Sequence, residues 1–130
     1  MSYRLEILPG EPIALITTPE DFRVGEDVPA ATNEFYKLMK NAEGNVYLIV
    51  DVTNYKVNIE DMLAGATLAA RGEMALFHHP RIYKILIVSP QPLAAISAKG
   101  MNTAPFGYPR VEPFSTIEDA LAEARSKPPQ

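Results

Sequence analysis

The sequence contains no cysteine and no tryptophan among its 130 residues. Without cysteine, the chain cannot form a disulfide framework, a thiolate zinc site, an iron–sulfur cluster or a cysteine nucleophile. It also lacks any run of about 18 consecutive apolar residues, which a membrane-spanning helix would need. Basic residues are not in excess, since 16 acidic side chains outnumber 12 basic ones. This charge balance argues against a nucleic-acid binder.

The first residues also lack the charged segment followed by an apolar segment that marks a signal peptide, so we expect a cytoplasmic protein. Hydrophobic residues make up 47% of the chain and the net charge is −4, which is typical of a folded globular protein rather than a disordered one. A chain of this length can bury one core but is short for two. We therefore predict a single domain over residues 1–130.

Proline is abundant, in contrast, and its placement is informative. The 12 prolines are about twice the ordinary share of ~5%, and none lies between residues 30 and 79. Because proline interrupts helix interiors and central strands, we expect the most regular structure in that interval. The chain shows no repeat of 20–50 residues and no low-complexity stretch.

Five segments have strand character. Alternating apolar residues predict a strand over residues 3–8, and the turn PGEP at residues 9–12 leads into an apolar run at residues 13–17. This arrangement predicts an antiparallel hairpin. Continuous apolar character, typical of strands covered on both faces, predicts strands at residues 45–53 and 82–89. A shorter strand is expected at residues 111–114, where Pro113 is tolerated at a sheet edge or at a strand end.

Helical spacing separates these strands. Apolar residues recur from Ala31 to Ala42, which predicts a helix over residues 30–41 after an irregular segment at 21–28. A second helix begins after the capping residue Asn58 and continues to about Phe77.

Two glycines within the second helix, Gly65 and Gly72, indicate close backbone packing or local weakness. A third helix is expected at residues 93–100. The fourth begins at a capping box in which Ser115 is the cap and Glu118 reaches back. The element order β-β-α-β-α-β-α-β-α predicts an α/β fold. We expect a small mixed, mostly parallel sheet of about five strands, with an N-terminal antiparallel hairpin and about four helices.

This order of elements, and three segments within it, resemble a known family. The segments are YLIVDVT at residues 47–53, RIYKILIV at 81–88 and VEPFSTIEDAL at 111–121. They are similar to the SpoIIAA-like proteins, which belong with the STAS domains (sulfate transporter and anti-sigma factor antagonist). The resemblance covers roughly residues 3–125. It implies a SpoIIAA-like, STAS fold and a regulatory role exerted through protein contacts.

One departure from the family bears on function. In STAS proteins that act as anti-sigma factor antagonists, the loop after the central strand ends in Asp-Ser-Ser-Gly-Leu, and a serine there is phosphorylated. The matching positions here are Ile59, Glu60, Asp61 and Met62, so no hydroxyl is present. Glu60 and Asp61 either cap the helix as ordinary first-turn acids, which we favour, or mimic a phosphorylated state.

Few residues point to catalysis or metal binding. His78 and His79 are adjacent, but a metal site needs a third ligand and the nearest acid is Glu73. We interpret the two histidines as a surface loop at a helix end. Asp51, within an apolar strand, is either a base with a raised pKa or a cap for loop amides, and we favour the cap. A phosphate-binding loop and a serine-hydrolase elbow are both missing. We therefore expect a non-enzymatic protein with no cofactor, no metal and no catalytic residue.

Ligands of open α/β sheets bind outside the carboxyl ends of the strands. Our first hypothesis is a regulatory or protein-binding module that acts through the loop at residues 53–62 and the following helix. The alternative is a carrier or sensor of a small apolar ligand or lipid, held between the loops after the two central strands and the segment 101–108, where Asn102 and Tyr108 are further candidate walls. A homodimer that covers a sheet edge is also expected. The candidate binding residues are Thr53, Asn54, Tyr55, Asn58, Asp61, Ser89, Gln91, Met101 and Phe106.

Overall fold

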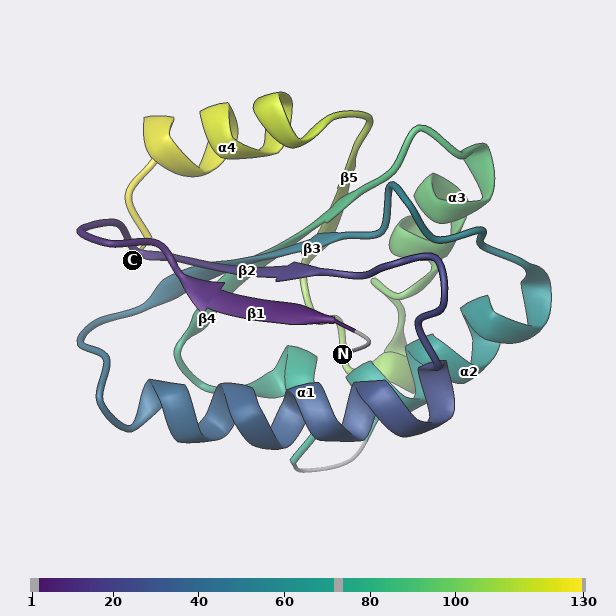
Figure 1. Ribbon diagram of the computed structural model, residues 1–130, viewed down its shortest axis with the longest axis horizontal. Coiled ribbons are helices and arrows are strands. Elements are labelled where there is room, and N and C mark those ends of the chain that lie inside the picture. Colours follow the sequence, from purple (N-terminus) through teal and green to yellow (C-terminus); the bar gives the residue numbers. More distant parts are fainter. Residues whose placement is uncertain (1–2, 72–73, 130) are drawn as a thin grey trace.

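The computed structural model describes residues 3–71 and 74–129, which form a five-stranded sheet in the order β1-β2-β3-β4-β5 (Figure 1). The first two strands pair antiparallel as a hairpin, and all other neighbours pair parallel. The predicted mixed, mostly parallel sheet is therefore confirmed, and Pro113 does lie in an edge strand. The strands are β1 (Arg4–Ile7), β2 (Ile13–Thr17), β3 (Val46–Asp51), β4 (Ile82–Val88) and β5 (Val111–Phe114).

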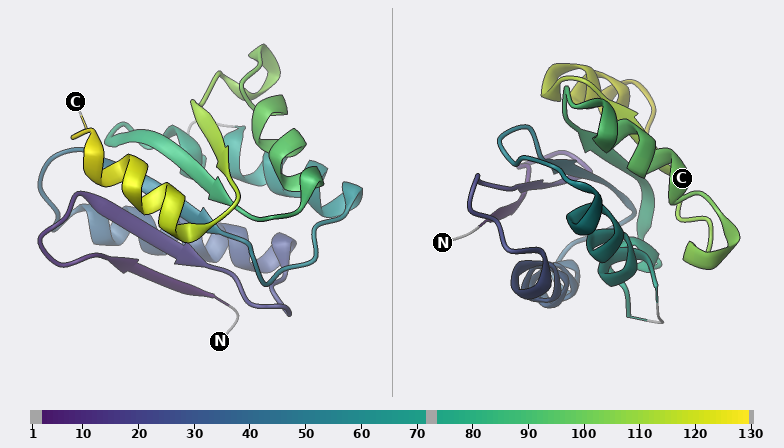
Figure 2. Two further views of the ribbon diagram at one scale, coloured as in Figure 1. Left: turned by 90° about the horizontal axis from the view of Figure 1, so that it is seen from above. Right: turned by 90° about the vertical axis from the view of Figure 1, so that its right-hand side faces the viewer.

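Helices cover both faces of this sheet. In Figure 1, α1 and α2 lie below the sheet and α4 lies above it. Figure 2, right, shows α3 beside α2, at the end of the molecule where the parallel strands terminate. The helices are α1 (Val24–Met39), α2 (Ile59–Ala70), α3 (Pro92–Gly100) and α4 (Ile117–Ser126), with short 3-10 turns η1 (Leu76–His78) and η2 (Ala104–Phe106).

Alternation along the strands divides the core into two layers. On β3, Val46 and Leu48 pack towards α1, α2 and α3, whereas Tyr47 and Ile49 pack towards α4. All four side chains are buried. Because both faces of the central strands are covered, their sequences are continuously apolar, as predicted.

The first helix begins earlier than predicted. It starts at Val24 rather than at residue 30, so the segment 21–28 is not irregular throughout. The backbone N–H of Arg23 donates to the carboxylate of Asp27 at 2.8 Å, which satisfies a group that would otherwise be unpaired at the helix start. Pro29 lies inside this helix and is exposed. Its missing N–H costs one hydrogen bond near the N-terminal end, and the helix tolerates that loss.

The second helix ends earlier than predicted, at Ala70 rather than near Phe77. Nε2 of His78 lies 2.8 Å from the carbonyl oxygen of Ala70 and satisfies that terminal group. The chain then turns so that Leu76 and Phe77 enter the core. Gly72 lies outside the described residues.

Of the two predicted helix caps, one is confirmed and one is shifted. Oδ1 of Asn58 accepts from the backbone N–H of Asp61 at 2.8 Å. The cap of α4 is Thr116 rather than Ser115. Oγ1 of Thr116 accepts from the backbone N–H of Asp119 at 3.2 Å. Both hydroxyl residues have an acid three positions later, so the motif alone does not distinguish them.

Candidate functional site

An apolar cavity of about 130 Å³ lies over the carboxyl ends of β2, β3 and β4. Ile16, Val50 and Ile87 form its floor, one residue from each strand. Val50 and Ile87 remain partly exposed although they belong to interior strands that helices cover. The open space above them accounts for that exposure.

Three helices and two loops form the walls of the cavity. Phe22 and the first turns of α1 close one side, α2 a second, and α3 a third. After its first turn, α2 contributes the small residues Gly65, Ala66 and Ala69 to the wall, which leave space between this helix and the sheet. The remaining wall residues are Thr18, Val24, Val28, Ala31, Val52, Tyr55, Val57, Asp61, Met62, Leu76, Phe77, Ala94, Ser97 and Met101.

A hydrogen-bonded group sits where α2 begins. The hydroxyl of Tyr55 and Nδ2 of Asn58 both donate to Oδ2 of Asp61, the latter at 3.0 Å. Burial, the hydrogen bond to Asp61 and the negative charge of Asp61 raise the pKa of Tyr55 above its ordinary value. The phenol therefore stays protonated and keeps its role as donor to Asp61.

The side chain of Gln91 joins the loops that follow β3 and β4. Its Nε2 donates to the carbonyl oxygen of Tyr55 at 2.7 Å, and its Oε1 accepts from the backbone N–H of Val57 at 3.1 Å. Oγ of Ser89, which is buried, accepts from the backbone N–H of Gln91 at 3.0 Å. The structure thus brings together residues that the sequence analysis placed at the ends of two separate strands.

The candidate residues of the sequence analysis divide by location. Tyr55, Asp61 and Met101 line the cavity. Asn58, Ser89 and Gln91 fix the loops beside it through the hydrogen bonds just described, but they are not among its lining residues. We use the term rim loops for residues 52–58 and 89–91.

Thr53, Asn54 and Phe106 lie away from the cavity. Thr53 and Asn54 are exposed, and Asn54 borders a shallow depression next to Pro19 and Glu20. The carbonyl oxygen of Phe106 lies 2.7 Å from Nε2 of His78, which holds η2 near the end of α2. A binding role for these residues stays a prediction.

Two other residues of the sequence analysis have structural contacts. Oδ1 of Asp51 accepts from the backbone N–H of Thr53 at 3.0 Å, in agreement with the capping interpretation. His79 is half-buried and packs edge-on against Phe35 and Tyr36, and burial together with the charge of Arg81 lowers its pKa. Across residues 3–71 and 74–129, no three histidine, aspartate or glutamate side chains gather as a metal site.

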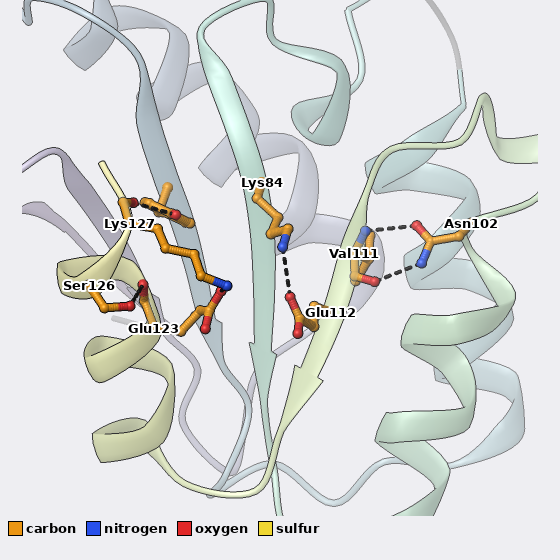
Figure 3. Close-up of polar contacts among 8 residues, drawn as sticks. Lys84, Asn102, Val111, Glu112, Glu123, Ser126 and Lys127 are labelled. Atoms are coloured by element: carbon orange, nitrogen blue, oxygen red, sulfur yellow. Dashed lines mark hydrogen bonds and ion pairs between the residues drawn. The ribbon is translucent and has the colours of Figure 1, made fainter. Parts of the chain in front are cut away.

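The face of the sheet that α4 covers carries surface ion pairs (Figure 3). Lys84 and Glu112 also border an open depression there. Nζ of Lys84 on β4 lies 2.9 Å from Glu112 on β5, and this bond raises the pKa of Lys84. The side-chain amide of Asn102 donates to and accepts from the backbone of Val111, both at 2.7 Å. Asn102 thus positions the start of β5, and neither it nor Tyr108 lines the cavity at the carboxyl ends.

Sequence reasoning missed the contribution of Phe22, Val24 and Val28, because it treated their segment as irregular. It also missed Ala66 and Ala69 as wall residues. The available signal was the series Gly65, Ala66, Ala69 on the face of α2 that packs on the sheet. Small side chains on a packing face occupy little volume, so space can remain between the helix and the sheet.

The structure is thus an α/β fold with a mixed five-stranded sheet and an apolar cavity at the carboxyl ends of its parallel strands. A search of solved structures finds the crystal structure of an uncharacterised protein of the DUF3478 family, with a SpoIIAA-like fold, from Shewanella loihica PV-4. The match has a TM-score of 0.58, covers 94% of this chain and 91% of that chain, and has 13% sequence identity. The predicted fold is therefore confirmed.

Neither a protein-family model nor a curated protein matches the sequence. No helix within the described part of the chain is both long and apolar enough to traverse a bilayer.

Proposed function

We propose that this protein binds a small apolar molecule in the cavity over the carboxyl ends of β2, β3 and β4. The structural comparison gives the fold alone, so the observation that supports this proposal is the cavity itself. It is lined almost entirely by apolar side chains, and Val50 and Ile87 on its floor remain partly exposed. Apolar cavities of similar size stay dry and take up apolar molecules.

The size of the cavity limits the ligand. A volume of about 130 Å³ is close to the engineered cavity of roughly 150 Å³ that binds benzene. We therefore expect a six-membered ring or a chain of about six carbons. Burial of six such groups at about 0.8 kcal/mol each corresponds to a dissociation constant of roughly 0.1–1 mM.

Thermal unfolding with and without toluene tests this proposal. We expect saturating toluene to raise the melting temperature, because a ligand that binds the folded state alone stabilises it. The Ala66→Leu variant should abolish the shift by filling the cavity. Ala64→Leu is the matched control, since Ala64 lies on the same helix, is exposed and is not a wall residue. A toluene shift that Ala66→Leu leaves intact contradicts the location of the site.

We propose, as a second candidate function, a regulatory module that binds a protein partner through the loop at residues 53–62 and α2. Ile59 and Leu63 support this candidate, because they lie one helical turn apart and are 63% and 58% exposed. Contiguous exposed apolar surface marks sites of contact with other proteins, and this pair would contribute to such a surface.

Affinity capture with the immobilised protein tests the second candidate. A specific partner should be retained by the wild type and released by Leu63→Asp. Ala122→Asp is the control, because Ala122 is exposed on α4, away from this surface. Equal retention by both variants would remove this surface from consideration.

The remaining sequence-based proposals are a single domain over residues 1–130, a cytoplasmic location and a homodimer. Among residues 3–71 and 74–129, each edge strand, β1 and β5, pairs with another strand on one side alone, which supports pairing between copies. Light scattering coupled to size-exclusion chromatography measures the oligomeric state directly.

A further inference from the structure

We infer that the cavity selects ligands whose head group donates hydrogen bonds, such as an alcohol or an amine, and rejects carboxylates. This inference rests on the proposed binding of a small apolar molecule and specifies the class of that molecule. The inference depends on Asp61. Among the described residues that line the cavity, Asp61 is the one with a charged side chain.

Asp61 occupies the part of the wall that reaches solvent. Its Oδ2 accepts a hydrogen bond from the side chain of Asn58, which is exposed and is not a lining residue, whereas Ile16 and Ala66, deeper in the cavity, are buried. A ligand whose apolar body fills the buried part therefore places its head group near the carboxylate of Asp61. A hydroxyl or ammonium group can donate to that carboxylate, whereas a ligand carboxylate would meet a like charge.

The nearby donors do not offset this repulsion, because they already bind Asp61. Tyr55 and Asn58 both donate to its Oδ2. Lys56, the cation closest in sequence, is exposed and is not among the lining residues. A ligand carboxylate at this position would therefore lack a partner of opposite charge within the described wall.

The N-terminus of α2 does not reverse the preference. A helix start normally attracts anions through its free N–H groups and dipole. Here Asn58 caps the helix, and Glu60 and Asp61 place two acidic side chains in its first turn. The helix supplies its own anions and leaves little positive potential for the ligand.

Three ligands with one phenyl ring and one further carbon test the inference: benzyl alcohol, benzylamine and benzoate. Titration followed by NMR or calorimetry at neutral pH should give benzoate a dissociation constant at least tenfold weaker than that of benzyl alcohol. Benzylamine should bind at least as tightly as benzyl alcohol. Equal binding of benzoate and benzyl alcohol would overturn the inference and leave the proposed function intact. If neither toluene nor any of the three ligands binds, the proposed function itself fails.

Two neighbouring carboxylates provide a matched pair of variants. Asp61→Asn should narrow the difference between benzoate and benzylamine severalfold, because the charge at the wall is lost. Glu60→Gln removes the same charge from the same helical turn, but Glu60 is exposed and is not a wall residue, so it should preserve the difference. If both variants narrow it equally, long-range charge rather than contact with Asp61 sets the preference and the inference is wrong. The wild-type comparison above decides the preference even if Asp61→Asn destabilises the fold.

Discussion

Gln91 and Tyr55 connect two loops: Nε2 of Gln91 donates to the carbonyl oxygen of Tyr55 at 2.7 Å. Oε1 of Gln91 accepts from the backbone N–H of Val57 in the same loop as Tyr55. One side-chain amide thus supplies a donor and an acceptor to an irregular backbone, as a neighbouring strand would. The rim loops are held together by this amide, and their arrangement beside the cavity depends on it.

Gln91→Met is expected to destabilise the protein by about 1–3 kcal/mol, because it leaves part-buried backbone groups of Tyr55 and Val57 without partners. Urea unfolding measures the change in free energy. Hydrogen exchange should show faster exchange of the Val57 amide in particular. Lys56→Met, at an exposed position of the same loop, is the control and should change neither measurement. Unchanged protection of Val57 in Gln91→Met would contradict the role assigned to the amide.

Arg81 terminates the first helix from a distance in sequence. Its guanidinium donates to the carbonyl oxygens of Met39 at 2.6 Å, of Gly44 at 2.9 Å and of Ala42. Lysine cannot reproduce this fork, so Arg81→Lys should cost about 1–3 kcal/mol of stability. Arg71→Lys, an exposed position, should stay within about 0.5 kcal/mol. Chemical denaturation of both variants makes the comparison, and equal stabilities would refute the helix-end role.

Alanine substitutions at Gly107 and Gly44 distinguish the cost of backbone strain from the cost of a steric clash. Both glycines have φ near +70°, at +73° and +74°. A Cβ atom at Gly107 would lie 2.9 Å from Cε1 of His78, whereas one at Gly44 would meet nothing within 4 Å. Gly44→Ala should cost about 1 kcal/mol for the left-handed conformation alone. Gly107→Ala should cost more, because His78 must also move. Thermal unfolding ranks the two, and the reverse order would be inconsistent with the contact.

His79 makes stability depend on pH in a known direction. Burial, aided by the charge of Arg81, lowers its pKa in the folded protein below the usual 6.5. The unfolded chain therefore takes up the proton first, and stability falls as the pH drops below about 6.5 until the folded form is also protonated.

His79→Phe keeps an aromatic ring against Phe35 and Tyr36 but cannot titrate. Urea unfolding at pH 7.5 and 5.5 should show a smaller loss of stability in this variant than in the wild type. His78 is present in both chains, so the difference reports on His79. An equal loss in the two proteins would show that other groups cause the acid sensitivity.

The central strands could be predicted from sequence because burial on both faces requires a continuous run of apolar residues. Residues such as Leu48 and Leu86 are fully buried, and their neighbours alternate between two packed layers, so the whole run is apolar. The start of the first helix could not be predicted in this way. It depends on a contact between the backbone of Arg23 and the side chain of Asp27. Pro29, two residues later, is normally a sign that a helix begins after it, so the sequence favoured a later start.

The candidate site was predicted in its location at the strand ends but not in its composition. Tyr55, Asp61 and Met101 do line the cavity. They lie in the loop after β3, in the first turn of α2 and at the C-terminal end of α3. The small residues of α2 are a local signal for the space, but they do not fix its size, because the size also depends on how far Ala66 on α2 lies from Val50 on β3. That distance is set by the packing of several elements at once.

The small residues of α2 have a consequence for how this protein can change over time. Because Gly65, Ala66 and Ala69 limit the cavity from one side, single substitutions on one helix face can shrink or reshape it. The strands of the floor and the hydrogen bonds of the rim loops need not change. The size of the proposed ligand can therefore change through a few positions on one helix, both in evolution and by design.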